Sequence, residues 1–580
     1  MTILDFKNVS IDFPTSTGIV HAVTDVSLSI GEGRRIGFIG ESGSGKTTTA
    51  LSAMRMLASP GFVSGGEIHL HSLPESNLLK LSDEDMRNVR LSRISYIPQG
   101  AMNSLNPVMR IENQIWDGIV AHEGAMAEEE LRQRSNRALE SVGLDPDIVG
   151  QLYPHELSGG MKQRVCIAIG VCLDPDLIIA DEPTSALDVI TQRHVMQTLR
   201  DVQGKIGAGL ILIGHDMGLM AQSVDEIGVL KKGELVEFGP VRQIIEDPQH
   251  PYTRELISSV PLVGGESFLD PKPATPAKGY ATEDGTPLLE LRSVSKTYGA
   301  VTALHPMSFS LDGEEPKIIS IVGQSGSGKS TMGSLMLGFN EPSTGAVLFK
   351  GHDINRQSAP EALAFRKDVQ AVFQDPYACF NPFYRVNHAL KFPFERFGLS
   401  EGPAHVQQAM EDACRAVGLA PETVLGRYPH QLSGGQRQRL IVARALMLSP
   451  KLLIADEPVS MVDASLRATI LKNIHDLKDQ HGISIVYITH DLATAYHVSD
   501  YVMVLYKGHV VEAGPPKDVI GDPQHAYTKL LISSIPWPDL DRDWGSSEDA
   551  EAGLAELARI DGRHEMILRS TIPGFSLGVD

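Results

Sequence analysis

Two patterns of apolar and polar residues occur along the chain, and both occur twice. Continuous apolar runs, such as R-R-I-G-F-I-G and K-I-I-S-I-V-G, are followed by segments of helical character. Such runs predict parallel strands that helices cover on both faces. In Leu4–Phe13 and Leu289–Tyr298 apolar and polar residues alternate instead, which predicts antiparallel strands with one wet face. We therefore expect an α/β protein with two related units.

The spacing of repeated residues confirms that the chain is internally duplicated. His215 and His490 lie 275 residues apart, and several other repeated motifs share this separation. The lysines of a repeated glycine-rich loop, Lys46 and Lys329, lie 283 residues apart instead. About eight extra residues are therefore expected between the loop and the later motifs of the first unit, with Leu73–Asn88 as their expected place.

Pro- and Gly-rich composition suggests where the units end. Residues 261–287 are rich in Pro, Gly and small polar residues, which indicates a semi-extended linker. We therefore expect a first domain at 1–260 and a second at 288–536. Residues 537–580 begin with an acidic, turn-rich stretch and are expected to form a C-terminal tail.

Composition narrows the classes of function. The net charge of −21 argues against broad binding to a nucleic-acid backbone and otherwise favours solubility. The four cysteines form no C-x-x-C pair, so we expect neither a metal site nor a disulfide framework. The N-terminus lacks the pattern of a secretory signal, and no apolar run approaches the roughly 18–20 residues that cross a bilayer. Any membrane part is expected on other chains.

Two segments, Gly40–Thr47 and Gly323–Ser330, fit the phosphate-binding pattern G-x-x-x-x-G-K-[ST]. Its glycines expose backbone N–H groups to phosphates, its lysine reaches the β- and γ-phosphates, and its Ser or Thr hydroxyl holds Mg²⁺. The expected nucleotide-binding residues are Gly40, Ser42, Gly43, Gly45, Lys46, Thr47, Thr48, Gly323, Ser325, Gly326, Gly328, Lys329, Ser330 and Thr331.

Paired carboxylates, Asp181–Glu182 and Asp456–Glu457, follow apolar strands in both units. Phosphoryl transfer needs a metal ion near the phosphates and an oriented water. We expect the Asp of each pair to hold Mg²⁺ and the Glu to orient or deprotonate the water. His215 and His490 each end a strand and are expected to hydrogen-bond the γ-phosphate or this water. A single histidine would more often be structural, but the repetition favours the catalytic interpretation.

A third motif, L-S-G-G, precedes a predicted helix in each unit, where free N–H groups and the helix dipole favour phosphate. Two aspartates, Asp188 and Asp463, end the segments S-A-L-D and S-M-V-D. The further nucleotide-binding residues expected here are Ser158, Gly159, Gly160, Asp188, Ser433, Gly434, Gly435, Gln436 and Asp463.

This set of motifs resembles the nucleotide-binding domains of ABC transporters over about nine-tenths of the chain. The resemblance implies two tandem P-loop NTPase (ABC-type) domains, each with a RecA-like parallel-sheet core, an antiparallel β subdomain and a helical subdomain. It also implies a head-to-tail pseudo-dimer within one chain, with ATP between the domains. Ser158 would then act on the nucleotide held by Lys329, and Ser433 on the one held by Lys46.

Further residues match positions of known role in that family. Gln99 and Gln374 match its glutamine loop, which contacts Mg²⁺ or water and senses the membrane partner. Phe13 and Tyr298 match its adenine-stacking aromatic residue, although each could equally be a core residue.

A closer similarity is to the oligopeptide/dipeptide/nickel importer subfamily, with the two ATPases fused. It rests on N-S-L-N-P and C-F-N-P after the two glutamines and on D-P-Q-H-P-Y-T and D-P-Q-H-A-Y-T near the domain ends. It implies a peripheral motor at the cytoplasmic face of the inner membrane, working with two integral-membrane permease subunits and an external solute-binding protein. No cysteine follows Cys414, so we expect no iron–sulfur cluster. Met161 departs from the usual Gln without removing a catalytic group, so we expect two competent sites.

The resulting hypothesis is an ATP-hydrolysing importer motor, with peptide as the leading substrate. Nickel, opines, glutathione and oligosaccharides are the alternatives that the subfamily implies. A soluble tandem ATPase acting on ribosomes or DNA would be expected to show a charged linker, a basic arm or zinc-binding cysteines. An exporter would normally carry fused membrane helices.

Overall fold

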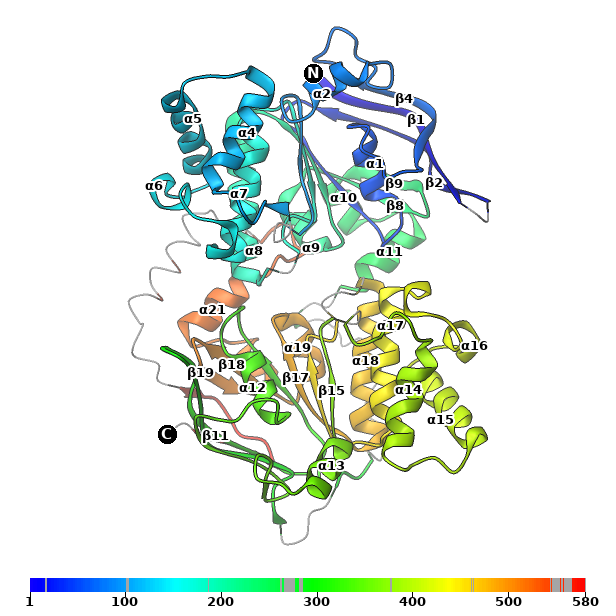
Figure 1. Ribbon diagram of the computed structural model, residues 1–580, viewed down its shortest axis with the longest axis vertical. Helices are drawn as coiled ribbons and strands as arrows, with labels where there is room; N and C mark the ends of the chain where they lie inside the picture. Colours follow the sequence, from blue (N-terminus) through cyan, green and yellow to red (C-terminus); the bar gives the residue numbers. More distant parts are fainter. Residues whose placement is uncertain are drawn as a thin grey trace. The chain divides into compact units, whose positions relative to one another are not determined.

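The computed structural model describes residues 1–15, 18–100, 104–185, 187–260, 263–264, 277–280, 285–375, 378–459, 462, 464–542, 544, 553, 557 and 566–578 (Figure 1). The chain forms two compact units. The first consists of Met1–Val260 with Ser534–Ala552, and the second of Pro261–Ser533 with Gly553–Asp580.

The first unit is built on a six-stranded sheet. Its order is β5-β6-β7-β3-β8-β9, with β9 antiparallel to β8 and the other neighbours parallel. The strands are β3 (Arg35–Ile39), β5 (Ile94–Ile97), β6 (Leu177–Asp181), β7 (Gly209–Ile213), β8 (Glu226–Lys231) and β9 (Glu234–Pro240). Residues of β6 and β7 are all buried, as expected for strands that are covered on both faces.

A second, antiparallel sheet of β2, β1 and β4 lies in the same unit. These strands span Gly18–Gly31, Thr2–Thr15 and Phe62–Leu70. The helices of the unit are α1 (Lys46–Ser52), α2 (Asp83–Val89), α4 (Ile111–Glu123), α5 (Glu128–Ser141), α6 (Pro146–Val149), α7 (Gly159–Val171), α8 (Val189–Ile206), α9 (Met217–Ser223), α10 (Val241–Glu246) and α11 (Pro251–Ser258). Figure 1 shows α4, α5, α6 and α7 gathered as a helical group.

The second unit repeats this plan with additional strands. Its larger sheet has the order β15-β16-β17-β12-β18-β19-β20, and its smaller sheet the order β14-β13-β10-β11-β21. The strands are β10 (Leu289–Tyr298), β11 (Val301–Leu311), β12 (Ile318–Val322), β13 (Thr344–Phe349), β14 (His352–Asp353), β15 (Val369–Val372), β16 (Leu452–Asp456), β17 (Ser484–Thr489), β18 (Tyr501–Tyr506), β19 (His509–Gly514), β20 (Ile567–Leu568) and β21 (Phe575–Gly578).

The helices of the second unit follow in the same order as those of the first. They are α12 (Lys329–Met336), α13 (Ala359–Asp368), α14 (Val386–Arg396), α15 (Pro403–Ala416), α16 (Pro421–Val424), α17 (Gly434–Leu446), α18 (Ala464–His481), α19 (Leu492–Val498), α20 (Pro516–Val519) and α21 (Ala526–Ser533). The predicted α/β class, with a parallel-sheet core and an antiparallel sheet in each unit, is confirmed.

The extra residues of the first unit are not in one loop, so the prediction of a single insertion at Leu73–Asn88 is wrong. Strand register matches Leu70 with Phe349, because each is the partner of the equivalent leucine of β1 or β10. Lys46 and Leu70 are 24 residues apart, whereas Lys329 and Phe349 are 20 apart. Half of the extra residues therefore precede the end of β4, and half follow it.

The C-terminal residues also differ from a simple tail. β20 pairs with β19 and β21 with β11, so residues 566–578 extend both sheets of the second unit. Phe575 is buried there, 6% exposed, against Phe309 and Tyr501. The sequence pattern did not reveal these strands because their partners lie more than 50 residues away.

Residues just after α21 instead belong to the first unit. A Cβ at Gly218 in α9 would lie 2.0 Å from the carbonyl oxygen of Pro536, so only glycine permits this contact. The Gln222 amide donates to the carbonyls of Trp537 and Asp539, at 3.0 and 2.7 Å. Trp544 is buried in the core of this unit.

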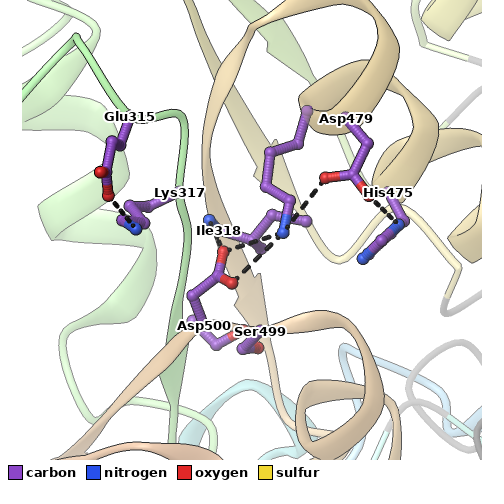
Figure 2. A network of polar contacts seen from close by, with 9 residues as sticks. Glu315, Lys317, Ile318, His475, Asp479, Ser499 and Asp500 are labelled. Carbon is purple, nitrogen blue, oxygen red and sulfur yellow. Dashed lines mark hydrogen bonds and ion pairs between the residues drawn. The ribbon is translucent and has the colours of Figure 1, made fainter. Parts of the chain in front are cut away.

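A buried ion network fixes the strand that leads into the second glycine-rich loop (Figure 2). Asp500 accepts the Ile318 N–H at the start of β12 at 2.9 Å, and the Lys478 ammonium donates to Asp500 at 3.1 Å. In the first unit Asp225 accepts the equivalent N–H of Arg35 at 3.0 Å, and the Arg35 guanidinium supplies the positive charge at 2.7 Å. The carboxylate is thus retained while its cation moves from the strand to a helix.

Within the described part of the chain, no helix has both the length and the apolar content to cross a bilayer. The expected linker lies mostly outside the described residues. Its described stretch 277–280 attaches to the second unit, where the Ala277 N–H donates to the Asp479 carbonyl at 2.9 Å.

Candidate nucleotide-binding sites

Both glycine-rich loops connect a buried strand to a helix, β3 to α1 and β12 to α12. Gly40 and Gly323 have φ of +152° and +154°, a region that strongly favours glycine. A Cβ at Gly40 would lie 2.2 Å from the carbonyl oxygen of Leu230, so the loop requires glycine for space as well. Gly45 and Gly328 then open the helices with φ of +100° and +106°.

The two loop lysines lie within the loops and are largely buried. Lys46 Nζ donates to the carbonyls of Gly40 at 2.7 Å and of Glu41 at 2.9 Å. Lys329 Nζ makes the matching bonds to Gly323 and Gln324, at 2.7 and 2.8 Å. An ammonium group beside the first turn of a helix concentrates positive potential at the loop, which suits an anionic ligand.

The strands β6 and β16 end in Asp181 and Asp456. Each aspartate lies near the start of the helix that follows the glycine-rich loop of its unit. Thr47 Oγ1 donates to Asp181 Oδ1 at 3.2 Å, and the Tyr96 hydroxyl donates to Oδ2 at 3.1 Å. Burial raises the pKa of Asp181 despite these two bonds. Burial and the neighbouring Glu457 carboxylate likewise raise the pKa of Asp456. Hydroxyl and carboxylate oxygens therefore converge at this point of both units.

The glutamate, histidine and glutamine expected at the reaction centre are brought together in the first unit. Glu182 Oε2 accepts from Gln99 Nε2 at 2.6 Å, and Glu182 Oε1 lies 3.1 Å from His215 Nδ1. Glu182 has φ of +43°, which is strained for a residue with a side chain. Burial would raise the pKa of Glu182, but the bond to His215 and the nearby Lys46 charge outweigh it and lower the pKa.

The second unit reproduces this cluster. Glu457 Oε2 accepts from Gln374 Nε2 at 2.9 Å, and Glu457 Oε1 lies 2.9 Å from His490 Nδ1. Its φ is +47°. Burial would lower the pKa of His490, yet the Glu457 carboxylate outweighs burial and raises it. The same strained glutamate between an amide and an imidazole in both units shows that the arrangement is built into each domain.

The L-S-G-G serines begin helices, as predicted. Ser158 Oγ accepts the Met161 N–H at 3.3 Å at the start of α7, where Gly159 and Gly160 form the first turn. Ser433 accepts from Gln436 N at 3.2 Å, and the Gln436 side chain in turn accepts the Ser433 N–H at 3.0 Å. Met161 occupies the position of Gln436 in the first unit, and its side chain cannot accept the Ser158 N–H. Of these two helices, only α17 therefore has the reciprocal cap.

Other predicted residues occupy different settings. Asp188 caps α8 by accepting from the N–H and hydroxyl of Thr191, at 3.1 and 3.0 Å, whereas Asp463 lies outside the described residues. Phe13 is partly buried and packs against Gly61, where a Cβ would be 2.4 Å from its ring. Tyr298 is 46% exposed.

Sequence reasoning missed Tyr96, which occupies an apolar strand and has Ala371 as its equivalent in the second unit. It also missed two tyrosines that contact the glycine-rich loops, Tyr252 and Tyr527. The repetition of D-P-Q-H-x-Y-T at a separation of 275 residues was the available signal.

Each unit places an aspartate with a neighbouring hydroxyl group, and a glutamate–histidine pair, beside its glycine-rich loop. Two such sites in one chain define a tandem P-loop ATPase. The family model "ABC transporter" matches residues 23–185 and 304–460, and the model "Oligopeptide/dipeptide transporter, C-terminal region" matches 236–281 and 511–560. The chain belongs to the ABC transporter family, as one of its ATP-binding, ATP-hydrolysing proteins. The predicted membership of the oligopeptide/dipeptide/nickel importer subfamily is confirmed.

Individual relatives extend over nearly the whole chain. The glutathione import ATP-binding protein GsiA of Escherichia coli strain K12 is 38% identical over 565 residues, which covers 92% of this chain and 89% of the relative. GsiA of Salmonella typhimurium is 39% identical over 568 residues, covering 93% and 90%. A solved dimeric structure of the ATP-binding cassette MJ0796, bound to ADP and Pi in a post-hydrolysis state, is 28% identical, covers 41% of this chain and 98% of its own, and gives a TM-score of 0.37.

Proposed function

We propose that this chain is the ATP-hydrolysing motor of an importer for glutathione or similarly small peptides. The observation that supports it most is the duplicated cluster of Glu182 with His215 and Glu457 with His490 beside two phosphate-binding loops. The match to GsiA over nine-tenths of both chains supports the import of glutathione. Peptide was the leading substrate expected from the sequence and glutathione one of its alternatives, and glutathione is itself a short peptide.

The chemistry follows from the groups in each site. N–H groups of the loop and the Lys46 ammonium bind the phosphates. Glu182 is kept ionised at neutral pH, so it can orient an attacking water and accept its proton. His215 contacts the other carboxylate oxygen and holds the side chain in place.

The oxygen atoms near each loop fit Mg²⁺, which prefers oxygen ligands. Thr47 with Asp181, and Ser330 with Asp456, would hold the ion, with Gln99 and Gln374 as further candidates. When bound, Mg²⁺ neutralises charge that develops on the phosphate oxygens. No group of three or more His, Cys, Asp or Glu side chains suited to a metal occurs in the described parts of the chain. An ion that is held mainly by phosphate and water does not require one.

We further propose that each L-S-G-G segment completes the opposite site, so that Ser158 acts on the nucleotide at Lys329 and Ser433 on the one at Lys46. ATP would then favour the closed pair more strongly than ADP, which supplies the free energy for the conformational change. Phe13 and Tyr298 would stack on adenine. Phe13 is partly buried, whereas Tyr298 is 46% exposed with the Lys296 ammonium 5.1 Å from its ring centre. Asp188 and Asp463 would lie near this interface.

Permease subunits would dock on the segments between each glutamine and each L-S-G-G motif. In the second unit an aromatic row lies on α14 and the turn before it. Tyr384 stacks on His388 with 4.4 Å between centroids, His388 stacks on Phe392 at 5.7 Å, and Phe383 is 86% exposed. In the first unit Val108, the equivalent of Phe383, is 79% exposed. Exposed apolar groups of this kind are typical of interaction surfaces. Such docking would place the chain at the cytoplasmic face of the inner membrane, with an external solute-binding protein in the full complex.

The ATPase proposal is tested with Glu182→Gln and Glu457→Gln, alone and together. We expect ATP binding to persist while turnover of the double variant falls by roughly 10²–10⁴-fold, the usual range for loss of a general base. A Glu128→Gln variant, changed at an exposed helix position, is the control. Normal turnover in the double variant would exclude both glutamates from this role. A single variant that loses far more than half of the turnover would show that the sites are coupled.

The substrate proposal is tested separately. The chain would be co-purified with its membrane subunits and reconstituted in vesicles with the associated solute-binding protein. ATP-dependent uptake of labelled glutathione is expected. Uptake of longer peptides or nickel without glutathione would exclude glutathione as the substrate.

A further inference from the structure

Each unit holds a buried tyrosine hydroxyl against its phosphate-binding loop. The Glu41 N–H donates to the Tyr252 hydroxyl at 3.1 Å, and the Gln324 N–H donates to the Tyr527 hydroxyl at 2.8 Å. Tyr252 lies on α11 and is 3% exposed, and Tyr527 lies on α21 and is fully buried. Glu41 and Gln324 occupy the second position of the G-x-x-x-x-G-K pattern, so the tyrosines contact equivalent peptides of the two loops.

The residue that each tyrosine contacts is fixed at both of its backbone polar groups. Its carbonyl accepts from the loop lysine, at 2.9 Å for Glu41 and Lys46 and at 2.8 Å for Gln324 and Lys329. Its N–H is committed to the tyrosine. A backbone N–H donates along one direction, so the bond to the phenol fixes the orientation of this peptide. The loop residues that follow it, which would contact the phosphates, therefore continue from a peptide of fixed orientation.

The tyrosines are themselves held by the sheet. In the first unit the Tyr252 N–H donates to His250 Nδ1 at 3.2 Å, and the Glu237 carboxylate of β9 accepts the N–H groups of Gln249 and His250 at 2.8 and 3.0 Å. The repeated D-P-Q-H-x-Y-T segment therefore connects the sheet to the loop.

The same connection recurs in the second unit. The Tyr527 N–H donates to His525 Nδ1 at 3.1 Å, and Glu512 of β19 accepts the N–H groups of Gln524 and His525 at 3.0 Å each. Glu512 is fully buried. A buried carboxylate that is satisfied by two N–H donors is a rigid anchor, because losing them would leave a charge without partners.

The surroundings of the two rings differ, whereas the hydroxyl contact does not. The Lys231 ammonium lies 4.2 Å from the centre of the Tyr252 ring. The equivalent position in the second unit is Tyr506, whose ring centre lies 4.4 Å from that of Tyr527. The feature that both units share is thus the bond from the hydroxyl to the loop, not the packing of the ring.

We propose that Tyr252 and Tyr527 are positioning residues that set the phosphate-binding loops for nucleotide, and that this is the role of the D-P-Q-H-x-Y-T segments. The inference rests on the proposed function only in that the loops bind ATP phosphates. The tyrosines act through the loop peptide and do not touch the reacting atoms.

The test uses the full chain with Tyr252→Phe, Tyr527→Phe and the double variant. Calorimetry gives the Kd for ATP and ADP, and steady-state kinetics gives KM and kcat. We expect the double variant to raise Kd and KM about tenfold, which corresponds to about 1.4 kcal/mol, with kcat at saturating ATP within about twofold of the wild type. A residue that serves only stability would lower the melting temperature without separating KM from kcat.

Tyr501→Phe is the matched control, since Tyr501 is 1% exposed and contacts Phe575 in the core of the second unit. Unchanged Kd and KM in the double variant overturn the proposal, provided that Lys46→Ala with Lys329→Ala abolishes binding. If the lysine variant also binds ATP normally, the proposed function fails instead.

Hydrogen exchange of the wild-type chain tests the geometry without a substitution, in case a variant does not fold. The Glu41 and Gln324 amides are expected to exchange at least about 10²-fold more slowly than unstructured amides in nucleotide-free protein, because each is bonded to a buried hydroxyl. Exchange of both at unprotected rates would overturn the proposal.

Discussion

Replacing Phe575 with alanine tests whether the C-terminal strand is an integral part of the second unit. Phe575 lies in β21, and its ring centre is 5.8 Å from that of Phe309 and 4.8 Å from that of Tyr501. Removing a buried phenylalanine side chain typically costs about 3–5 kcal/mol. β21 pairs with β11 through four residues at the edge of a sheet. The strand can therefore detach while the rest of the unit stays folded. The measurable loss of free energy in Phe575→Ala cannot exceed the free energy that detachment costs in the wild type.

Hydrogen exchange measures this detachment directly, whereas global unfolding of a two-unit chain is not a two-state process. Amides of β11 that face β21 exchange when the strand detaches. A loss of about 3 kcal/mol would accelerate their exchange by roughly 10²-fold. Phe383→Ala, at a position that is 86% exposed, is the control and should leave this exchange unchanged. If Phe575→Ala also leaves β11 exchange at the wild-type rate, the strand pairing described here does not stabilise the sheet.

Three further outcomes follow from the structure. Gly218→Ala should displace the segment at Pro536, because its Cβ would lie 2.0 Å from that carbonyl oxygen, and protease cleavage after α21 should become faster. Burial raises the pKa of Cys166 and Cys172 to about 12, so iodoacetamide at pH 8 should label these thiols only after denaturation. Burial would raise the pKa of Asp225, but its bonds to Arg35 outweigh burial and lower the pKa. The ionised carboxylate therefore stabilises the fold above its unfolded-state pKa, and this stabilisation is lost as pH falls through the folded-state pKa. The melting temperature of Asp225→Asn should therefore vary less than that of the wild type below about pH 4.

Much of each site could be predicted from the sequence because local constraints determine it. The glycines of the loops meet a backbone conformation that excludes other residues, and Gly40 shows both the positive φ and the lack of space. Strands that end in polar residues deliver them to one edge of a parallel sheet, which is why Gln99, Glu182 and His215 could be expected to meet. The signals for these residues lie within a few positions of each side chain.

Features that depend on distant pairing were not predictable in the same way. The strands β20 and β21 form by pairing with β19 and β11, which lie much earlier in the chain. The sequence of residues 566–578 contains no signal that identifies these partners. The extra residues of the first unit were placed in one loop because counting between motifs gives only their sum. Tyr252 was overlooked because its function depends on a hydroxyl that meets a loop 211 residues earlier.

The path of the chain has a consequence for gene organisation. The polypeptide completes its second ATPase only after returning to the first for Ser534–Ala552, and Trp544 of that stretch is buried in the first core. If the gene were divided within 261–287, the N-terminal product would lack Ser534–Ala552. It would be complete only after it bound this segment of the C-terminal product. Joining the halves makes that encounter intramolecular, which raises the effective concentration of the peptide. A fused gene therefore ensures equal numbers of the two motors and also lets the second half finish the folding of the first.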